Sequence, residues 1–267
     1  MTARPGRVRR RVWWGAVGLC LALLSVGGCD RQPPSATDAE RRAYALDAEL
    51  EDARDAIHRG DIDAALAAVE RARAVDPESY RPLVVRGRVL MREGQPAKAR
   101  AAYESAARLA DQAAAVAVER SAMGPTDEGE DDDPEAALER RQRAIKDAAD
   151  ARLAAGTARL MSVFAEASER GPAAELSEEG LIEAKGAYER AAETADLLGD
   201  QGGRRSTDAR LHVALITALQ GERDSATTQI DMLEVGHGYD ADLAAFWRSV
   251  IRDGTLRARL TRDEPAP

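Results

Sequence analysis

The side chains best suited to acid–base or metal chemistry are three histidines, His58, His212 and His237, which lie far apart in the sequence. None has the spacing of a metal-binding helix, such as two histidines that flank a glutamate at positions i and i+4. The sequence also lacks a glycine-rich phosphate-binding loop. We therefore expect that the protein is not an enzyme and that it has no catalytic residue, no metal site and no cofactor. A hydrolase that uses scattered carboxylates is the alternative, because Asp and Glu number 47.

Carboxylates are concentrated in one short segment, where six of the seven residues 127–133 are Asp or Glu. Such a run could chelate Ca²⁺, which prefers oxygen ligands. The run lacks the alternating oxygen ligands and the placed glycine of a helix–loop–helix calcium site. We expect residues 123–133 to form a solvated acidic loop.

The thiol of Cys29 is the remaining candidate for chemistry. Five arginines near the N-terminus precede an apolar run, Val12–Val26, and the sequence Gly27-Gly28-Cys29 follows it. The run has 15 residues, fewer than the roughly 20 that a membrane-spanning helix needs. This arrangement resembles the precursor of a bacterial lipoprotein. The resemblance implies that residues 1–28 are a signal peptide and that Cys29 carries lipid.

The lipoprotein resemblance also implies a location. The mature chain would lie in the bacterial cell envelope, on the periplasmic side, held to a membrane by the lipid on Cys29 and a tether of residues 29–37. Lipid chains of this kind give stable membrane residence when two or more are present. In enteric lipoproteins an aspartate such as Asp30 favours the inner membrane over the outer. The alternatives are an ordinary signal peptide, an uncleaved anchor and twin-arginine export through Arg10-Arg11.

The composition describes an acidic, helical body. The whole chain has 38 Lys and Arg against 47 Asp and Glu, and residues 1–28 contain five of the arginines and no acid. This charge argues against nucleic acid as a partner and against lying flat on anionic lipid. Loss of Cys20 with the signal peptide would leave one cysteine, so we expect no internal disulfide. The abundance of alanine favours closely packed helices.

A repeat of helix-turn-helix type is visible in the first half of the body. Within Tyr80–Ala113 the repeat positions are Gly87, Gly94, Ala99, Tyr103 and Ala106. The preceding segment, Leu46–Ser79, matches mainly in its second half, at Gly60, Ala65, Val69, Ala72 and Pro77. These spacings resemble the tetratricopeptide repeat, a unit of 34 residues. An arbitrary alanine-rich antiparallel bundle is the alternative.

The resemblance implies an all-α fold of antiparallel helix-turn-helix repeats, a tetratricopeptide-like solenoid, over residues 38–122. Residues 134–200 match poorly, and we expect divergent packing helices there. A stripe of apolar residues predicts one long helix from Pro134 to about Arg170, at Leu138, Ile145, Leu153, Leu160 and Ala167. Residues 201–263 resemble a further repeat followed by C-terminal capping helices.

In tetratricopeptide proteins the first helix of each unit lines a concave groove. When the groove-facing positions of the family are mapped onto this sequence, the resemblance implies a groove surface made by Arg54, His58, Arg81, Arg88, Met91 and Arg92. Arg54 and Arg88 are equivalent in successive units, as are His58 and Arg92. Because arginine suits carboxylates, we expect an acidic or C-terminal segment of a protein partner in this groove. The alternative is that these arginines are solvated or paired with neighbouring glutamates.

Together these features predict a membrane-anchored lipoprotein that acts as a protein–protein interaction scaffold or adaptor in cell-envelope assembly or regulation. A passive structural spacer and an unrecognised envelope hydrolase are the other functions considered. The sequence carries no indication of an oligomeric state.

Overall fold

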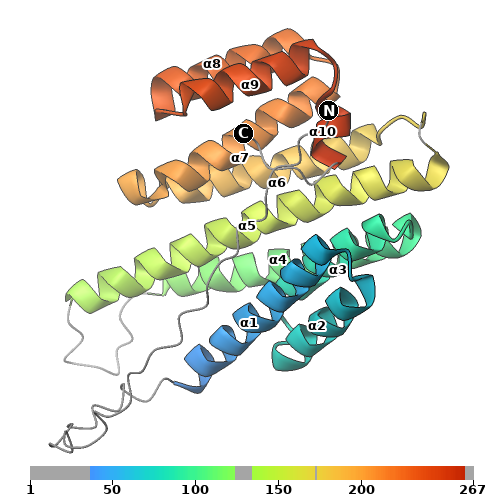
Figure 1. The fold of residues 1–267 in the computed structure, drawn as a ribbon. Helices are drawn as coiled ribbons and strands as arrows, with labels where there is room; N and C mark the ends of the chain where they lie inside the picture. Colours follow the sequence, from blue (N-terminus) through green and yellow to red (C-terminus); the bar gives the residue numbers. More distant parts are fainter. Residues whose placement is uncertain (1–36, 124–133, 172, 262–267) are drawn as a thin grey trace, which may run out of the picture. The chain divides into compact units, whose positions relative to one another are not determined.

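The computed structural model describes residues 37–123, 134–171 and 173–261. The chain divides into two compact units, Met1–Thr37 and Asp38–Pro267, and the helices found in the described residues belong to the second. In order they are α1 (Asp38–Arg59), α2 (Ile62–Val75), α3 (Arg81–Arg92), α4 (Pro96–Ala122), α5 (Pro134–Arg170), α6 (Glu178–Asp196), η1 (Gly199–Gly202), α7 (Gly203–Leu219), α8 (Arg223–His237), α9 (Ala241–Arg252) and α10 (Leu256–Thr261). No strand occurs in the described ranges (Figure 1). Among these residues no helix is both long and apolar enough to cross a membrane.

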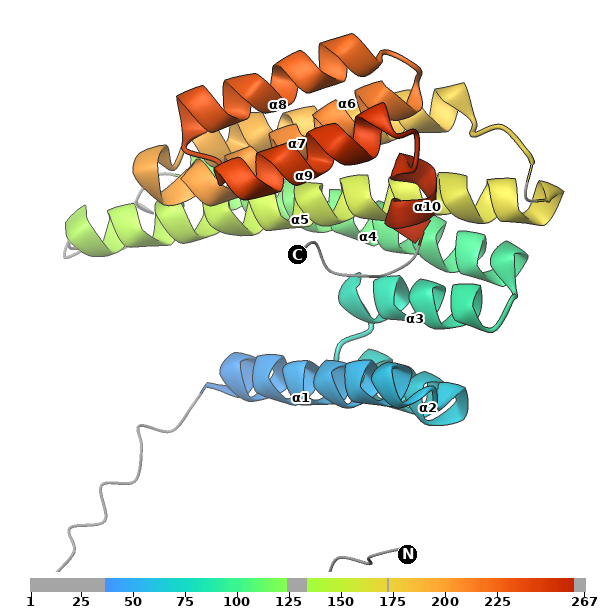
Figure 2. The same ribbon diagram turned by 45° about the horizontal axis from the view of Figure 1, so that its top comes forward.

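The Asp38–Pro267 unit is an all-α solenoid of antiparallel helix-turn-helix repeats, as the sequence predicts. From α1 to α9, each α-helix packs against the next one along the chain. Figures 1 and 2 show the pairs α1/α2, α3/α4, α5/α6 and α7/α8 stacked in chain order. First helices of neighbouring pairs also meet, because α1 contacts α3 and α5 contacts α7. A stack of this kind buries a continuous core that no single pair could bury alone.

One packing element joins the two helices of each pair, a small residue on the first helix opposite a large one on the second. A Cβ added to Gly87 would lie only 2.5 Å from Cε1 of Tyr103, so the glycine is what lets α3 approach α4. The α5/α6 pair repeats this arrangement, since a Cβ on Gly156 would lie 3.0 Å from the ring of Tyr188. Both tyrosines are fully buried.

The outer pairs use the same element with smaller side chains. Ala53 and Val69 share one core cluster in α1/α2, and Ala214 and Ile230 share another in α7/α8. All four residues are fully buried. Alanine therefore suffices opposite an aliphatic side chain, whereas the aromatic rings of the inner pairs require glycine. A second alanine, four residues before each large residue, is also fully buried, at Ala65, Ala99, Ala184 and Ala226.

Turns and caps define the helix boundaries. Gly60 and Gly94 end the first helices of the first two pairs in the left-handed region, with φ of 75° and 74°. A side chain there would be strained. Pro96 occupies the first turn of α4, where its missing N–H costs no hydrogen bond. The Ser177 hydroxyl accepts a hydrogen bond from the Gly180 amide and caps α6, as the sequence predicts.

The long helix predicted from Pro134 to about Arg170 is confirmed as α5. Its apolar stripe is only partly correct. Ile145, Leu160 and Ala167 are buried, but Leu138 is 55% exposed. Leu138 lies in the first turns of α5, where no residue before Ala144 is buried. The exposure therefore comes from its place at the start of the helix, which extends beyond its packing partners there, and not from the side of the helix that it occupies.

A candidate partner-binding groove

The residues predicted for the groove lie on two helices, Arg54 and His58 on α1 and the other four on α3. Arg54 is exposed and forms an ion pair of 3.1 Å with Glu51, one turn earlier on the same helix. His58 is also exposed. Neither residue lines the cavity described below.

Two of the α3 arginines hold α3 against α1. Arg81 forms an ion pair of 2.6 Å with Asp47, the residue at the equivalent position of the preceding unit. The Nη1 atom of Arg92 donates a hydrogen bond of 3.0 Å to the Ile57 carbonyl. The alternative interpretation is that the groove arginines are solvated or paired with neighbouring glutamates. Arg54 matches it through its pair with Glu51, the exposed Arg88 matches its solvated form, and Arg81 pairs with an aspartate instead.

Arg88, Met91 and Arg92 come together in one solvent-open cavity of about 180 Å³. Their counterparts on α5 line the same cavity, namely Thr157, Leu160 and Met161. The two sets lie at the same offsets from Gly87 and from Gly156, one, four and five residues later. The inner faces of α3 and α5 are thus equivalent surfaces of successive repeats, and the cavity lies between them.

Aromatic rings form the deeper wall of this cavity, from Tyr103, Phe164, Tyr188 and His212. The rings of Tyr188 and His212 are stacked, with centroids 4.6 Å apart and an interplanar angle of 14°. The Tyr188 hydroxyl lies 3.0 Å from the hydroxyl of Thr157. Desolvation by burial raises the pKa of Tyr188 well above its usual range, so the phenol stays protonated.

His212 contributes a neutral ring. Its Nδ1 lies 2.8 Å from the carbonyl oxygen of Asp208, which can only accept, so Nδ1 carries the proton and donates it. Burial lowers the pKa of His212, and the hydrogen bond to the Asp208 backbone opposes this shift only in part. The interior wall is therefore uncharged at neutral pH, and the charge of the cavity lies at its rim.

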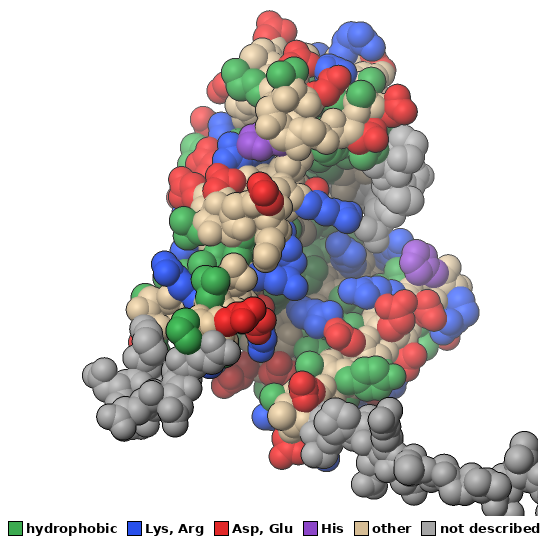
Figure 3. All heavy atoms as spheres, turned by 90° about the vertical axis from the view of Figure 1, so that its left-hand side faces the viewer, with side chains coloured by type: hydrophobic (Ala, Val, Ile, Leu, Met, Phe, Trp, Pro, Cys, Tyr) green, Lys and Arg blue, Asp and Glu red, His purple; other side chains and the backbone are tan. Residues whose placement is uncertain are grey.

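Arg88 supplies that rim charge. Its side chain is exposed, and no residue in the described ranges forms an ion pair or hydrogen bond with it. Figure 3 shows Lys and Arg side chains gathered around a hollow in this face of the molecule, with hydrophobic side chains deeper inside. A basic hollow is notable in a chain with a formal net charge of −9.

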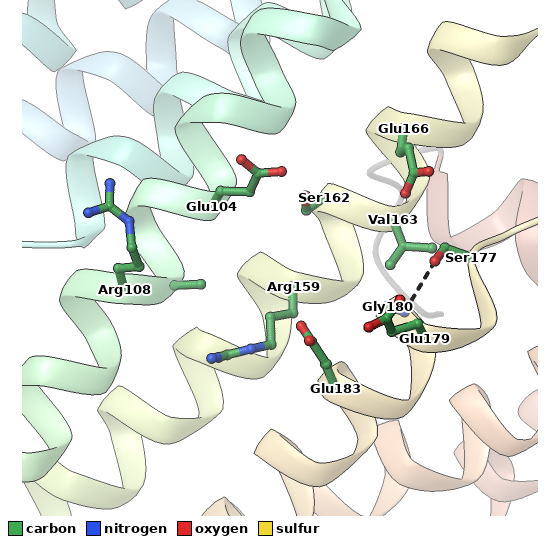
Figure 4. A pocket seen from close by; sticks show the side chains of 11 residues that line it. Glu104, Arg108, Arg159, Ser162, Val163, Glu166, Ser177, Glu179, Gly180 and Glu183 are labelled. Atoms are coloured by element: carbon green, nitrogen blue, oxygen red, sulfur yellow. Dashed lines mark hydrogen bonds between the residues drawn. The ribbon is translucent and has the colours of Figure 1, made fainter.

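A second cavity, of about 450 Å³, lies between α4, α5 and α6 and has the opposite character (Figure 4). Four glutamates line it, Glu104, Glu166, Glu179 and Glu183. Two arginines, Arg108 and Arg159, also line it, and Arg159 forms an ion pair with Asp111. Among the described residues no group of three or more His, Cys, Asp or Glu could hold a metal ion. Cys29, Asp30 and residues 124–133 lie outside the described residues, so the predicted lipidation site and most of the acidic loop are not seen.

The contribution of α5 to the groove was not predicted from the sequence, nor were Tyr188, His212 and Leu260. One sequence pattern could have identified α5 and α6 as a further repeat, because Ala184 precedes Tyr188 by four residues as Ala99 precedes Tyr103. The repeat is hard to recognise because Gly156 and Tyr188 are 32 residues apart, whereas Gly87 and Tyr103 are 16 residues apart.

Comparison with known proteins gives little further information. No family model matches the chain, and no curated protein matches it. Three chains of solved structures match. One comes from a structure titled as the functional characterization of Pseudomonas aeruginosa PilF, with 17% identity, a TM-score of 0.29, and coverage of 82% of this chain and 90% of that chain. At this identity and TM-score the likeness supports no conclusion about function.

Proposed function

We propose that this protein is a membrane-tethered adaptor whose concave groove binds an acidic segment of a protein partner. A solenoid of helical repeats is a scaffold that presents an extended concave surface for binding. The proposal assigns the groove to α3 and α5, with Arg88 as its exposed cation. The partner segment would run across the inner faces of these helices.

The observation that carries the proposal is the cavity shared by equivalent positions of α3 and α5, with an arginine at its rim that has no partner among the described residues. A guanidinium group offers a planar set of donors that matches a carboxylate, and such charge-assisted pairs are stronger than neutral hydrogen bonds. The acidic character of the rest of the chain would also repel acidic segments elsewhere on its surface.

The sequence before Asp38 supports the tether. In this proposal Cys29 carries lipid, the mature chain lies on the periplasmic side of a bacterial envelope membrane, and Asp30 favours the inner membrane. The adaptor would then serve envelope assembly or regulation. A short tether would keep the groove near the membrane surface, where membrane-bound partners are concentrated.

We propose no catalytic role for the acidic cavity. Glu104, Glu179 and Glu183 are exposed, and Glu166 is half-buried. Water solvates exposed carboxylates, whereas general acid–base catalysis usually relies on burial to bring a carboxylate pKa near neutrality. This arrangement favours an adaptor over an envelope hydrolase.

The test is chemical crosslinking and affinity capture from native membranes with the full chain. Arg88→Glu should abolish capture of the partner, because it reverses the rim charge. Arg54→Glu is the matched control on α1, outside the cavity, and it should retain most of the capture. Unchanged capture by both the Arg88→Glu variant and the Arg54/Arg88 double reversal would exclude the groove. A passive spacer predicts that no specific partner is captured by any form of the chain.

A further inference from the structure

The last described helix, α10, turns back toward the groove. After α9 the chain reverses at Gly254, whose φ is 70°, and Leu256 is buried in the C-terminal core. One turn later Leu260 lines the same cavity as Arg88 and Met91. A residue near the end of the described chain therefore forms part of the wall of a cavity that also contains residues of α3 and α5.

α10 is held mainly through its buried residue and through side-chain contacts of its arginines. It packs on α7 and α9, and Leu256 is its buried anchor. The Nη1 atom of Arg257 donates a hydrogen bond of 2.6 Å to the Ala174 carbonyl, and the guanidinium of Arg259 lies 5.2 Å from the centre of the Phe246 ring. Leu260 itself is only half-buried. Leu260 packs against the core cluster that contains Leu256 and against the cluster of Leu160 and Phe164, but unlike Leu256 it is not fully enclosed.

The open space beside Leu260 is of the right size and chemistry for one apolar side chain. Its volume is about 180 Å³, and a cavity of about 150 Å³ with an apolar lining can hold a benzene ring. Leu160, Met161 and Phe164 make its lining apolar. Methionine adapts its shape to different occupants, and both Met91 and Met161 contribute to the wall.

We propose that this cavity is an anchor subsite of the groove, that it takes one apolar or aromatic side chain next to a carboxylate of the bound segment, and that Leu260 fills part of it until that segment binds. The carboxylate lies against Arg88 at the rim, and the apolar group enters beside or in place of Leu260. This inference rests on the proposed function of the groove, and it adds the requirement for an apolar residue beside the acid.

A suitable probe is the dye 1-anilinonaphthalene-8-sulfonate, which combines an anionic sulfonate with apolar rings and fluoresces when shielded from water. The protein for the test is the Asp38–Pro267 unit, which packs internally. Leu260→Ala enlarges the cavity and should tighten dye binding at least ~3-fold, whereas Arg88→Gln should weaken it by a similar factor, each about 0.6 kcal/mol as RT ln 3. Leu197→Ala is the matched control, since Leu197 is a 72% exposed leucine, and it should leave dye binding unchanged.

The double variant Leu260→Ala/Arg88→Gln separates a specific effect from a general loosening of the fold. If the dye enters the cavity, Arg88→Gln removes most of the gain that Leu260→Ala produces. A gain that is independent of Arg88, or no gain from Leu260→Ala, would overturn the anchor subsite. These outcomes differ from failure of the proposed function, in which Arg88→Glu leaves partner capture unchanged whatever the dye does.

Discussion

Gly87 packs directly against the ring of Tyr103, which lines the groove cavity. Gly87→Ala should destabilise the protein by about 1–3 kcal/mol, because a Cβ 2.5 Å from a ring carbon forces the two helices apart. By helix propensity alone, alanine in place of glycine would stabilise the protein by about 1 kcal/mol. A measured destabilisation would therefore come from the contact with the ring. Urea unfolding followed by circular dichroism measures the change.

Gly186 provides the matched control within a helix. A Cβ at this position would have only the flexible end of Arg190 near it, at 3.5 Å. Gly186→Ala should therefore raise the free energy of unfolding by about 0.5–1 kcal/mol. A second control is Tyr103→Val, which would combine with Gly87→Ala to reproduce the Ala53/Val69 pair of the first unit. If Gly87→Ala costs as much in the Tyr103→Val background as in the parent protein, the ring is not the obstacle.

The half-buried His212, whose ring stacks on Tyr188, gives the protein a pH dependence of stability. Burial lowers its pKa from about 6.5, so below that pH the unfolded chain binds a proton that the folded chain does not. The free energy of unfolding should therefore fall as the pH decreases from about 6.5 toward the pKa of the folded state. Well above pH 6.5 both states are neutral at this residue and the effect disappears.

His212→Phe keeps an aromatic ring against Tyr188 and removes the titration. Melting temperatures measured between pH 7.5 and 5.5 should fall less steeply in this variant than in the parent protein. The other titrating groups are common to both proteins, so the difference between the two curves isolates His212. Parallel curves would show that His212 does not contribute.

At the scale of elements, residues close to each helix end predict most of the helix boundaries. Gly94 and Pro96 mark the turn into α4, and Ser177 marks the start of α6, because turn and cap chemistry acts within a few residues. The equivalence of α5 and α3 on the two sides of the cavity could not be predicted from such local signals. The greater length of α5 increases the sequence spacing between Gly156 and Tyr188 without changing how the two residues pack.

The cap of α9 offers a test at this scale. Oδ1 of Asp240 accepts hydrogen bonds of 2.9 Å from the amides of Asp242 and Leu243. Asp240→Ala removes both and should lower the free energy of unfolding by about 1 kcal/mol. Asp240→Asn retains a side-chain acceptor and should cost much less. Equal losses from alanine and asparagine in urea unfolding would argue against the cap as the source of the stability.

At the scale of the whole molecule, part of the candidate site could be predicted and part could not. Three of the residues predicted for the groove, Arg88, Met91 and Arg92, line one cavity. Their common helix face follows from the repeat, but their role in binding stays a prediction. Which arginines would be neutralised could not be predicted, since Asp47 reaches Arg81 only when α1 and α3 lie side by side. Leu260 was unpredictable for a similar reason, as its position depends on the turn after α9.

The proposed lipid anchor is tested by membrane fractionation of cells that express the full chain. Cys29→Ala should move the protein from the membrane to the soluble fraction, because the anchoring acyl chains can no longer be attached. Cys20→Ala is the matched control, since this cysteine lies in the segment expected to be removed, and its protein should stay in the membrane fraction. Membrane residence of the Cys29→Ala protein would contradict the lipoprotein proposal.

The ion pair between Arg81 and Asp47 has a consequence for the kinetics of encounter. Of the four arginines predicted to face the groove, Arg54 and Arg81 are compensated at short range by carboxylates of the chain itself. A compensated pair exerts little force beyond the Debye length, which is about 8 Å at physiological ionic strength. Diffusional steering of an acidic partner into the groove should therefore be weaker than four arginines would suggest. Its association rate should also decline only gently as salt is added.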